Sequence, residues 1–205
     1  MNEYEEYEET YSQDEIDLIS LGKSYYENEK YEDTIDIFLE LINLNPDNYE
    51  GWHYLGMSYT QIKEYEKAIG FLLKAIEYNP EEELDWCWLG YSYNENEQYQ
   101  EAINSLLKAV ELNPNDEYNW LWLGNSYIGL KDYNNAIQSY EKGIEINSTN
   151  CNMLNNYGVA LANLNRIEEA KKCFEKALEI DSDYNLAREN IDNLISSGIC
   201  KVSVL

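Results

Sequence analysis

Residues 85–114 read DWCWLGYSYNENEQYQEAINSLLKAVELNP, and the spacing of apolar residues in this stretch decides the fold. Its first half carries the stripe of an amphipathic helix, with i, i+3, i+4 and i+7 occupied by Trp86, Leu89, Gly90 and Tyr93. A second apolar stripe follows the polar segment 94–98, at Ala102, Leu106 and Ala109. We therefore expect two helices, over about residues 84–95 and 99–112. Asn113-Pro114 ends the second, because a residue before proline leaves the α region.

The same pattern recurs every 34 residues along most of the chain. The phrase that ends each unit closes at Pro46, Pro80, Pro114, Ser148 and Ser182. Leu-Gly pairs begin at Leu21, Leu55, Leu89 and Leu123, and the fifth copy has Tyr157-Gly158. Small residues, which allow two helices to approach closely, recur at Ala68, Ala102, Ala136 and Ala170. Since one helix pair cannot bury both of its faces, the copies are expected to stack.

The motif W-x2-L-G-x2-Y is complete at residues 52–59, 86–93 and 120–127, and it resembles the tetratricopeptide repeat family. The resemblance covers about 170 of the 205 residues. It implies an all-α fold: a right-handed α-solenoid of five tetratricopeptide helix pairs plus a C-terminal capping helix. The repeats are expected at residues 15–48, 49–82, 83–116, 117–150 and 151–184.

The flanks of the array are interpreted separately. Residues 1–14 form an acidic leader that we expect to be disordered. In the alternative, Tyr4, Tyr7 and Tyr11 extend the apolar stripe of the first helix. Ser12 and Glu15 have the spacing of a capping box that opens that helix. Residues 185–198 are predicted to form the solvating helix that such arrays need, and residues 199–205 form a tail.

The formal net charge of −26 argues against binding to nucleic acid or to an anionic membrane, since both require clustered Lys and Arg. No apolar run approaches the length of a membrane span, and the N-terminus has no signal-peptide pattern. The cytoplasm is the expected location.

Residue chemistry also argues against an enzyme. The chain has one histidine and four cysteines without a C-x-x-C pair, so no metal site is predicted and the cysteines are expected to be free thiols. Neither a glycine-rich phosphate loop nor a Ser/His/Asp set is recognisable. We predict no catalytic residue and no cofactor.

The family resemblance implies a concave groove, lined by the first helix of each repeat, that binds a protein or peptide segment. The best-defined site in the family is a basic clamp for an acidic C-terminal carboxylate. From the first repeat, the matching positions hold Ile19, Lys23, Tyr54, Leu84 and Trp88, and no other starting repeat supplies the basic set. Carboxylate binding of the chaperone type is therefore not expected.

The positions that line the family's groove are mostly apolar, aromatic or amide in this chain. Candidate partner-binding residues are Tyr54, Met57, Trp88, Tyr91, Leu121, Trp122, Asn125 and Asn155. They suit an apolar or amphipathic segment of a partner, which predicts an adaptor or scaffold. Alternatives are packing of these residues between neighbouring first helices, an acidic chaperone-like holder of a basic client, and a structural spacer.

Tryptophans occur in two pairs, at 86/88 and 120/122, and the two members of each pair are two residues apart. Residues two apart on a helix point about 200° apart, so the members of a pair cannot share a face. Trp86 and Trp120 belong to the repeat signature and are expected in the core. Trp88 and Trp122, with Tyr54 in the second repeat, are predicted to form an aromatic ladder on the groove side.

Overall fold

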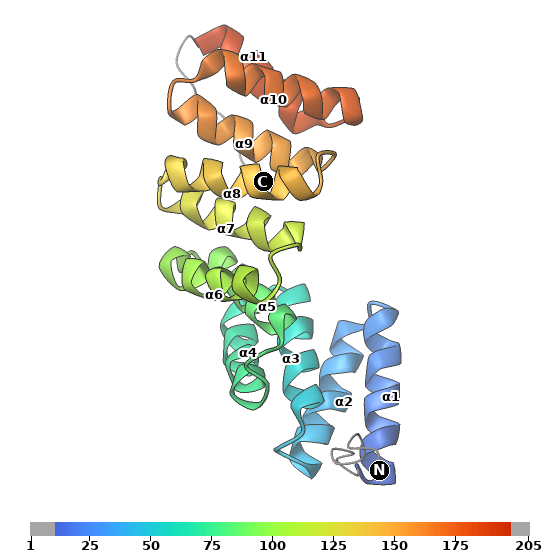
Figure 1. Cartoon of the computed structure of the whole chain (residues 1–205). Helices are drawn as coiled ribbons and strands as arrows, with labels where there is room; N and C mark the ends of the chain where they lie inside the picture. Colours follow the sequence, from blue (N-terminus) through green and yellow to red (C-terminus); the bar gives the residue numbers. More distant parts are fainter. Residues whose placement is uncertain (1–10, 198–205) are drawn as a thin grey trace, which may run out of the picture. The chain divides into compact units, whose positions relative to one another are not determined.

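The computed structural model describes residues 11–197, with side chains up to residue 194, and this part of the chain forms eleven α-helices and no strand (Figure 1). The helices are α1 (Gln13–Glu27), α2 (Tyr31–Leu44), α3 (Tyr49–Gln61), α4 (Tyr65–Tyr78), α5 (Glu83–Glu95), α6 (Tyr99–Leu112), α7 (Glu117–Gly129), α8 (Tyr133–Ile146), α9 (Cys151–Asn163), α10 (Ile167–Ile180) and α11 (Asn185–Ser197). Five helix pairs followed by a single helix confirm the predicted all-α class.

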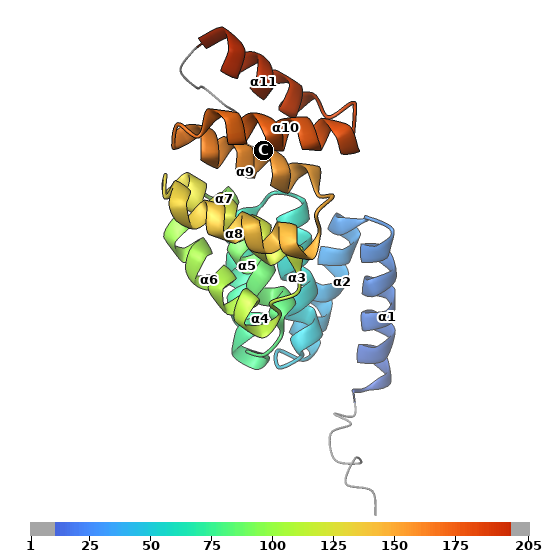
Figure 2. The same cartoon turned by 45° about the horizontal axis from the view of Figure 1, so that its top comes forward.

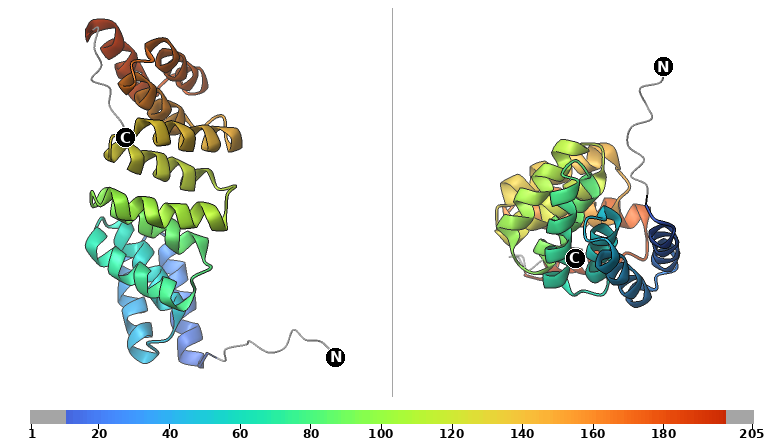
Figure 3. Two further views of the ribbon diagram at one scale, coloured as in Figure 1. Left: turned by 60° about the vertical axis from the view of Figure 1, so that its left-hand side comes forward. Right: turned by 90° about the horizontal axis from the view of Figure 1, so that it is seen from below.

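The chain divides into two compact units, Met1–Glu81 and Glu82–Leu205. The first contains α1 to α4 and the second α5 to α11. Within each unit, every helix packs against the next one in the chain. Figure 3 shows the second unit, from green to red, as successive stacked pairs, and Figure 2 shows α9, α10 and α11 together at its C-terminal end.

The helix pair of residues 85–114 agrees with its sequence pattern, since α5 and α6 match the predicted 84–95 and 99–112 to within one residue. The turn between them places Glu97 in the left-handed region at φ 59°, and the Gln98 N–H donates to the Tyr93 carbonyl (2.8 Å). This backbone geometry closes the C-terminus of α5. The other pairs repeat the left-handed residue at Glu29, Lys63, Lys131 and Asn165.

Glycines of the first helices set the close approach within each pair. A Cβ on Gly90 would lie 2.4 Å from Leu106 Cγ, and one on Gly124 would lie 2.4 Å from Tyr140 Cε1. Leu106 and Tyr140 are fully buried. The close approach of α5 and α6 therefore depends on Gly90, because Leu106 of α6 occupies the space that a Cβ would need.

The signature tryptophans lie at the edge of the core rather than inside it, and Trp120 packs against the core cluster of α6 and α7. Trp86 and Trp120 are only half-buried, and the buried aromatic residues of the second unit are instead Tyr140 and Phe174. The Trp120 indole N–H donates to the Pro114 carbonyl (2.9 Å). The prediction that both tryptophans fill the core is corrected to this extent: the Trp120 ring packs against the core, but its indole N–H stays at the surface, where it binds the preceding turn.

At the N-terminus, the capping box is confirmed. The Glu15 N–H donates to Ser12 Oγ, and the Glu15 carboxylate accepts the Ser12 N–H at 2.8 Å. Since α1 begins at Gln13, Tyr11 lies outside the helix. Tyr4, Tyr7 and the tail lie outside the described residues, so the predicted disorder of the leader stays a prediction.

The last helix packs on the core of the second unit. Ala187 of α11 is fully buried, and Ile191 and Leu194 contact the cluster that includes Phe174. One face of α11 is therefore covered, and the residues of its other face, such as Arg188 and Glu189, are exposed.

Candidate partner-binding surface

First and second helices form two different layers in the second unit. Helices α5, α7 and α9 contact one another in order, and α11 contacts α9. Among the described residues of this unit, α6, α8 and α10 make no such contacts with one another. Because the first helices lie closer together, they form the inner layer, and their exposed side chains form the candidate surface.

Three aromatic side chains of the inner layer form a continuous strip. The ring of Tyr91 lies 6.0 Å from Trp88 on α5, edge to face, and 4.4 Å from Trp122 on α7. All three are half-buried, so each keeps a face on its neighbours and area toward solvent. The Trp88 Nε1 atom is buried and has no hydrogen-bond partner in the described part of the chain. We call Trp88, Tyr91 and Trp122 the aromatic strip.

Beside the strip, asparagine side chains form a chain of hydrogen bonds across three helices. Asn190 of α11 donates to Asn155 Oδ1 (2.9 Å), and Asn155 donates to Asn156 Oδ1 (3.1 Å). Asn156 in turn donates to Asn125 Oδ1 (2.9 Å), which also accepts the hydroxyl of Tyr140 (2.7 Å). We call Asn190, Asn155, Asn156 and Asn125 the amide chain.

The amide chain fixes the orientation of its last member. Asn125 Oδ1 accepts two hydrogen bonds from buried groups, so its Nδ2 is the end left over, and that NH2 donates to no described residue. Asn125 follows Trp122 by three positions, which places both on one helix face. It also lines a cavity of about 240 Å³ with Asn94, Glu95, Glu97, Tyr99, Ile128 and Gly129. The surface therefore offers an amide donor beside the aromatic strip.

Two of the candidates lie in the first unit, where they pack locally. Tyr54 stacks on Phe38 at 4.8 Å and meets the edge of Tyr26 at 5.4 Å. Lys23 Nζ lies 5.6 Å from the Tyr54 ring centre, and burial raises the pKa of the Tyr54 hydroxyl. Met57 is buried, and its Sδ accepts from the hydroxyl of Tyr26 (3.8 Å).

The eight predicted residues thus fall into distinct groups. Trp88, Tyr91, Trp122 and Asn125 come together on one surface, whereas Met57, Leu121 and Asn155 are buried and leave little area for a partner. Tyr54 belongs to the first unit, so the predicted ladder is described only between Trp88 and Trp122, where Tyr91 joins them. Sequence reasoning missed Tyr140 and Asn190, although Asn156 and Asn190 are 34 residues apart.

Other chemistry is sparse in the part of the chain that the structure describes. No group of three or more His, Cys, Asp or Glu side chains could hold a metal ion there. None of the helices between residues 11 and 197 is long and apolar enough to cross a membrane. Cys87, Cys151 and Cys173 are free, and burial raises the pKa of the Cys87 thiol.

Family models match most of the repeat region. The tetratricopeptide repeat model matches residues 49–82. The model for anaphase-promoting complex, cyclosome, subunit 3, whose repeats are of the same type, matches residues 71–143 and 95–177. The chain belongs to the tetratricopeptide repeat family. A short match of residues 31–61 to the protein prenyltransferase alpha subunit repeat spans part of two helix pairs.

Solved structures share the fold. A crystal structure of MamA is 26% identical with a TM-score of 0.74, covering 80% of this chain and 96% of that one. YrrB, described as a tetratricopeptide protein with an unusual peptide-binding site, is 22% identical with a TM-score of 0.75, covering 85% and 90%. MamA from Desulfovibrio magneticus RS-1 is 16% identical with a TM-score of 0.79, covering 85% and 98%. No curated protein sequence matches the chain.

Proposed function

We propose that this tetratricopeptide protein is an adaptor that binds an apolar or amphipathic segment of a partner protein on the inner layer of its second unit. Proteins with this repeat fold are interaction scaffolds and are generally not enzymes. The observation that carries the proposal is the contact of Tyr91 with both Trp88 and Trp122, which gathers three half-buried rings beside the free NH2 of Asn125.

Each part of this surface contributes differently to binding. Trp and Tyr supply large contact areas at low conformational-entropy cost and are enriched at binding hot spots. Asn125 supplies a donor for a backbone carbonyl of the partner, and its orientation is set before binding. A donor that is already oriented loses little entropy on binding, which favours affinity.

A substitution that keeps the size of the side chain and adds one negative charge separates binding from packing. Asn125→Asp keeps the size of the side chain and both acceptor roles toward Tyr140 and Asn156, and replaces the outward donor by an acceptor. We expect this variant to fold with unchanged thermal stability and to lose partners in affinity capture with mass spectrometry. Trp88→Asn/Trp122→Asn is expected to lose the same partners. Its control is Leu73→Asn/Leu107→Asn, two exposed apolar residues that lie on the second helices α4 and α6.

Two results would overturn the proposal. If both surface variants retain every wild-type partner, the inner layer serves only as a spacer. If wild-type affinity falls by several orders of magnitude between low and high salt, the acidic surface rather than the strip holds the partner, and a basic client is the better description.

A further inference from the structure

The first helix pair leaves an apolar face that no described helix covers. Leu21 of α1 is 43% exposed and Leu44 of α2 is 52% exposed. Together with Leu18 they line a cavity of about 530 Å³ whose other lining residues are Asp14, Asp17, Glu40 and Asn43. We call these seven residues the terminal face.

The next repeat shows how the same face is normally covered. Leu55 lies 34 residues after Leu21 and is 0% exposed, because it belongs to the cluster formed with Phe38 and Leu41 of α2. In the part of the chain that the structure describes, no helix covers Leu21 in the way that α2 covers Leu55. Among the described residues of the first unit, the terminal face is thus the one position where the apolar stripe of a first helix is exposed.

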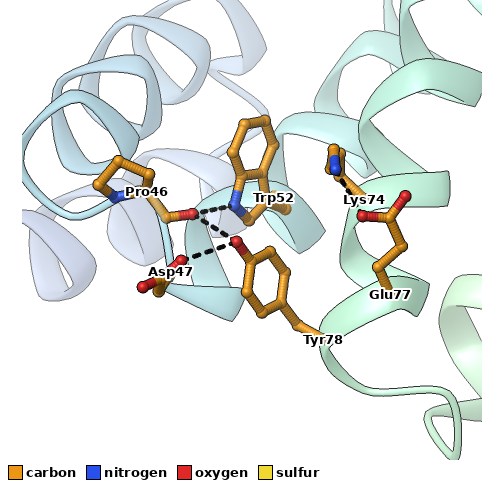
Figure 4. Close-up of polar contacts among 6 residues, drawn as sticks. All are labelled: Pro46, Asp47, Trp52, Lys74, Glu77 and Tyr78. Carbon is orange, nitrogen blue, oxygen red and sulfur yellow. Dashed lines mark hydrogen bonds and ion pairs between the residues drawn. The ribbon is translucent and has the colours of Figure 1, made fainter.

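The terminal face lacks the polar groups that the second helix pair has at the equivalent positions. This difference indicates what kind of partner could cover it. Figure 4 shows Trp52 and Tyr78 both donating to the Pro46 carbonyl, at 2.7 Å and 3.1 Å, so the preceding turn is held there by hydrogen bonds. The equivalent positions in the first pair are Leu18 and Leu44, which have no donor. The terminal face therefore suits a partner that presents apolar side chains, as an amphipathic helix does, and not a turn that presents carbonyls.

The charged residues around the terminal face indicate which charge a partner should carry. In the second pair, Lys74 and Glu77 form an ion pair at the rim (Figure 4), whereas the equivalent Glu40 and Asn43 carry one negative charge between them. Asp14 and Asp17 add two more on the α1 side. Across residues 11–48 there are ten acidic residues and two lysines, a net charge of −8. Of those lysines, Lys23 pairs with Glu50 at 3.0 Å.

We propose that the terminal face docks an amphipathic helix of a partner protein whose apolar stripe is flanked by Lys or Arg. Leu18, Leu21 and Leu44 receive the apolar stripe, and Asp14, Asp17 and Glu40 pair with the flanking cations. A second copy of this chain is disfavoured as the occupant because its own net charge is −26. The acidic segment 1–10 is disfavoured for the same reason.

The test uses the full chain and a fluorescent synthetic helical peptide of leucine and lysine, about 18 residues long with leucines at i, i+3, i+4 and i+7. Binding is measured by anisotropy, with a peptide carrying Glu for Lys as the control. Leu21→Ser/Leu44→Ser is expected to weaken binding at least tenfold. The matched pair Leu73→Ser/Leu130→Ser, with exposures of 42% and 46%, should change it less than twofold.

A second variant tests the charges without touching the leucines. Asp14→Asn/Asp17→Asn/Glu40→Gln should weaken binding and flatten its dependence on salt. The proposal fails if either terminal-face variant binds the peptide as tightly as wild type does. It fails if Leu73→Ser/Leu130→Ser weakens binding as much as Leu21→Ser/Leu44→Ser does. It also fails if Trp88→Asn/Trp122→Asn abolishes binding instead. A dimer in sedimentation that Leu21→Ser/Leu44→Ser abolishes would show that a second copy occupies the face. Stronger peptide binding by Tyr4→Ser/Tyr7→Ser would show that the chain's own leader occupies it. Either result contradicts the proposal.

Discussion

Gly124→Ala tests the close approach of α7 and α8. The added Cβ would lie 2.4 Å from Cε1 and 2.7 Å from Cζ of Tyr140, so the ring or the helix must move. The ring is fully buried and its hydroxyl donates to Asn125 at 2.7 Å, so movement also strains that bond. Overpacking costs about 1–3 kcal/mol and a lost hydrogen bond about 1, while alanine regains about 1 kcal/mol of helix propensity. We expect the free energy of unfolding to fall by about 1–3 kcal/mol.

Gly70→Ala is the matched control for this effect. Gly70 is exposed within α4, and a Cβ there meets no atom within 4 Å. The same substitution should therefore stabilise the protein by about 0.5–1 kcal/mol. Urea denaturation followed by circular dichroism compares the two variants with wild type. If Gly124→Ala is as stable as Gly70→Ala, the reasoning on helix approach is wrong.

Two further predictions concern acid titration and the tryptophans. The side chain of Asn45 and the N–H of Ser12 hold the pKa of Glu15 at about 2, below the ordinary 4.5, so its contribution to stability is present above pH 4.5 and is lost as the pH falls toward 2. Glu15→Gln should therefore destabilise the protein at pH 7, and the difference from wild type should shrink across that window in pH-dependent urea unfolding. Desolvation raises the pKa of Glu83, so its ionised carboxylate lowers the stability of the folded state instead of raising it. Glu83→Gln should therefore not destabilise the protein at pH 7. The second prediction is that Trp120→Ala costs less than Phe174→Ala, for which about 3–5 kcal/mol is expected, although tryptophan is larger; thermal unfolding of the two variants ranks them, and the reverse order would restore a core role for Trp120.

The repeat pattern was sufficient to predict the helices because periodicity and proline position are local properties of the chain. The ends of α5 and α6 follow from the polar segment 94–98 and from Asn113-Pro114. Burial of individual side chains depends on what lies against them, which a local pattern does not contain. Trp120 matches the signature, yet its N–H is drawn to the Pro114 carbonyl at the surface.

The candidate site was predictable in part for the same reason. Helical spacing places Trp88 and Tyr91 on one face, and their contact within α5 is therefore a local property. The amide chain is not local, since Asn125 and Asn190 are 65 positions apart and are joined only through α9. In the sequence, the only trace of these amide–amide hydrogen bonds is that asparagine recurs at equivalent positions of the repeats.

The amide chain also carries a sense of direction. A single asparagine can exchange its oxygen and nitrogen by a half-turn with almost no change in shape. In the amide chain, such a half-turn at one member would set two donors or two acceptors against each other, so the members turn together or not at all. The orientation of Asn125 is therefore inherited from Asn190 on α11. Helix α11 thereby decides whether the distant surface of α7 offers a partner a hydrogen or a lone pair.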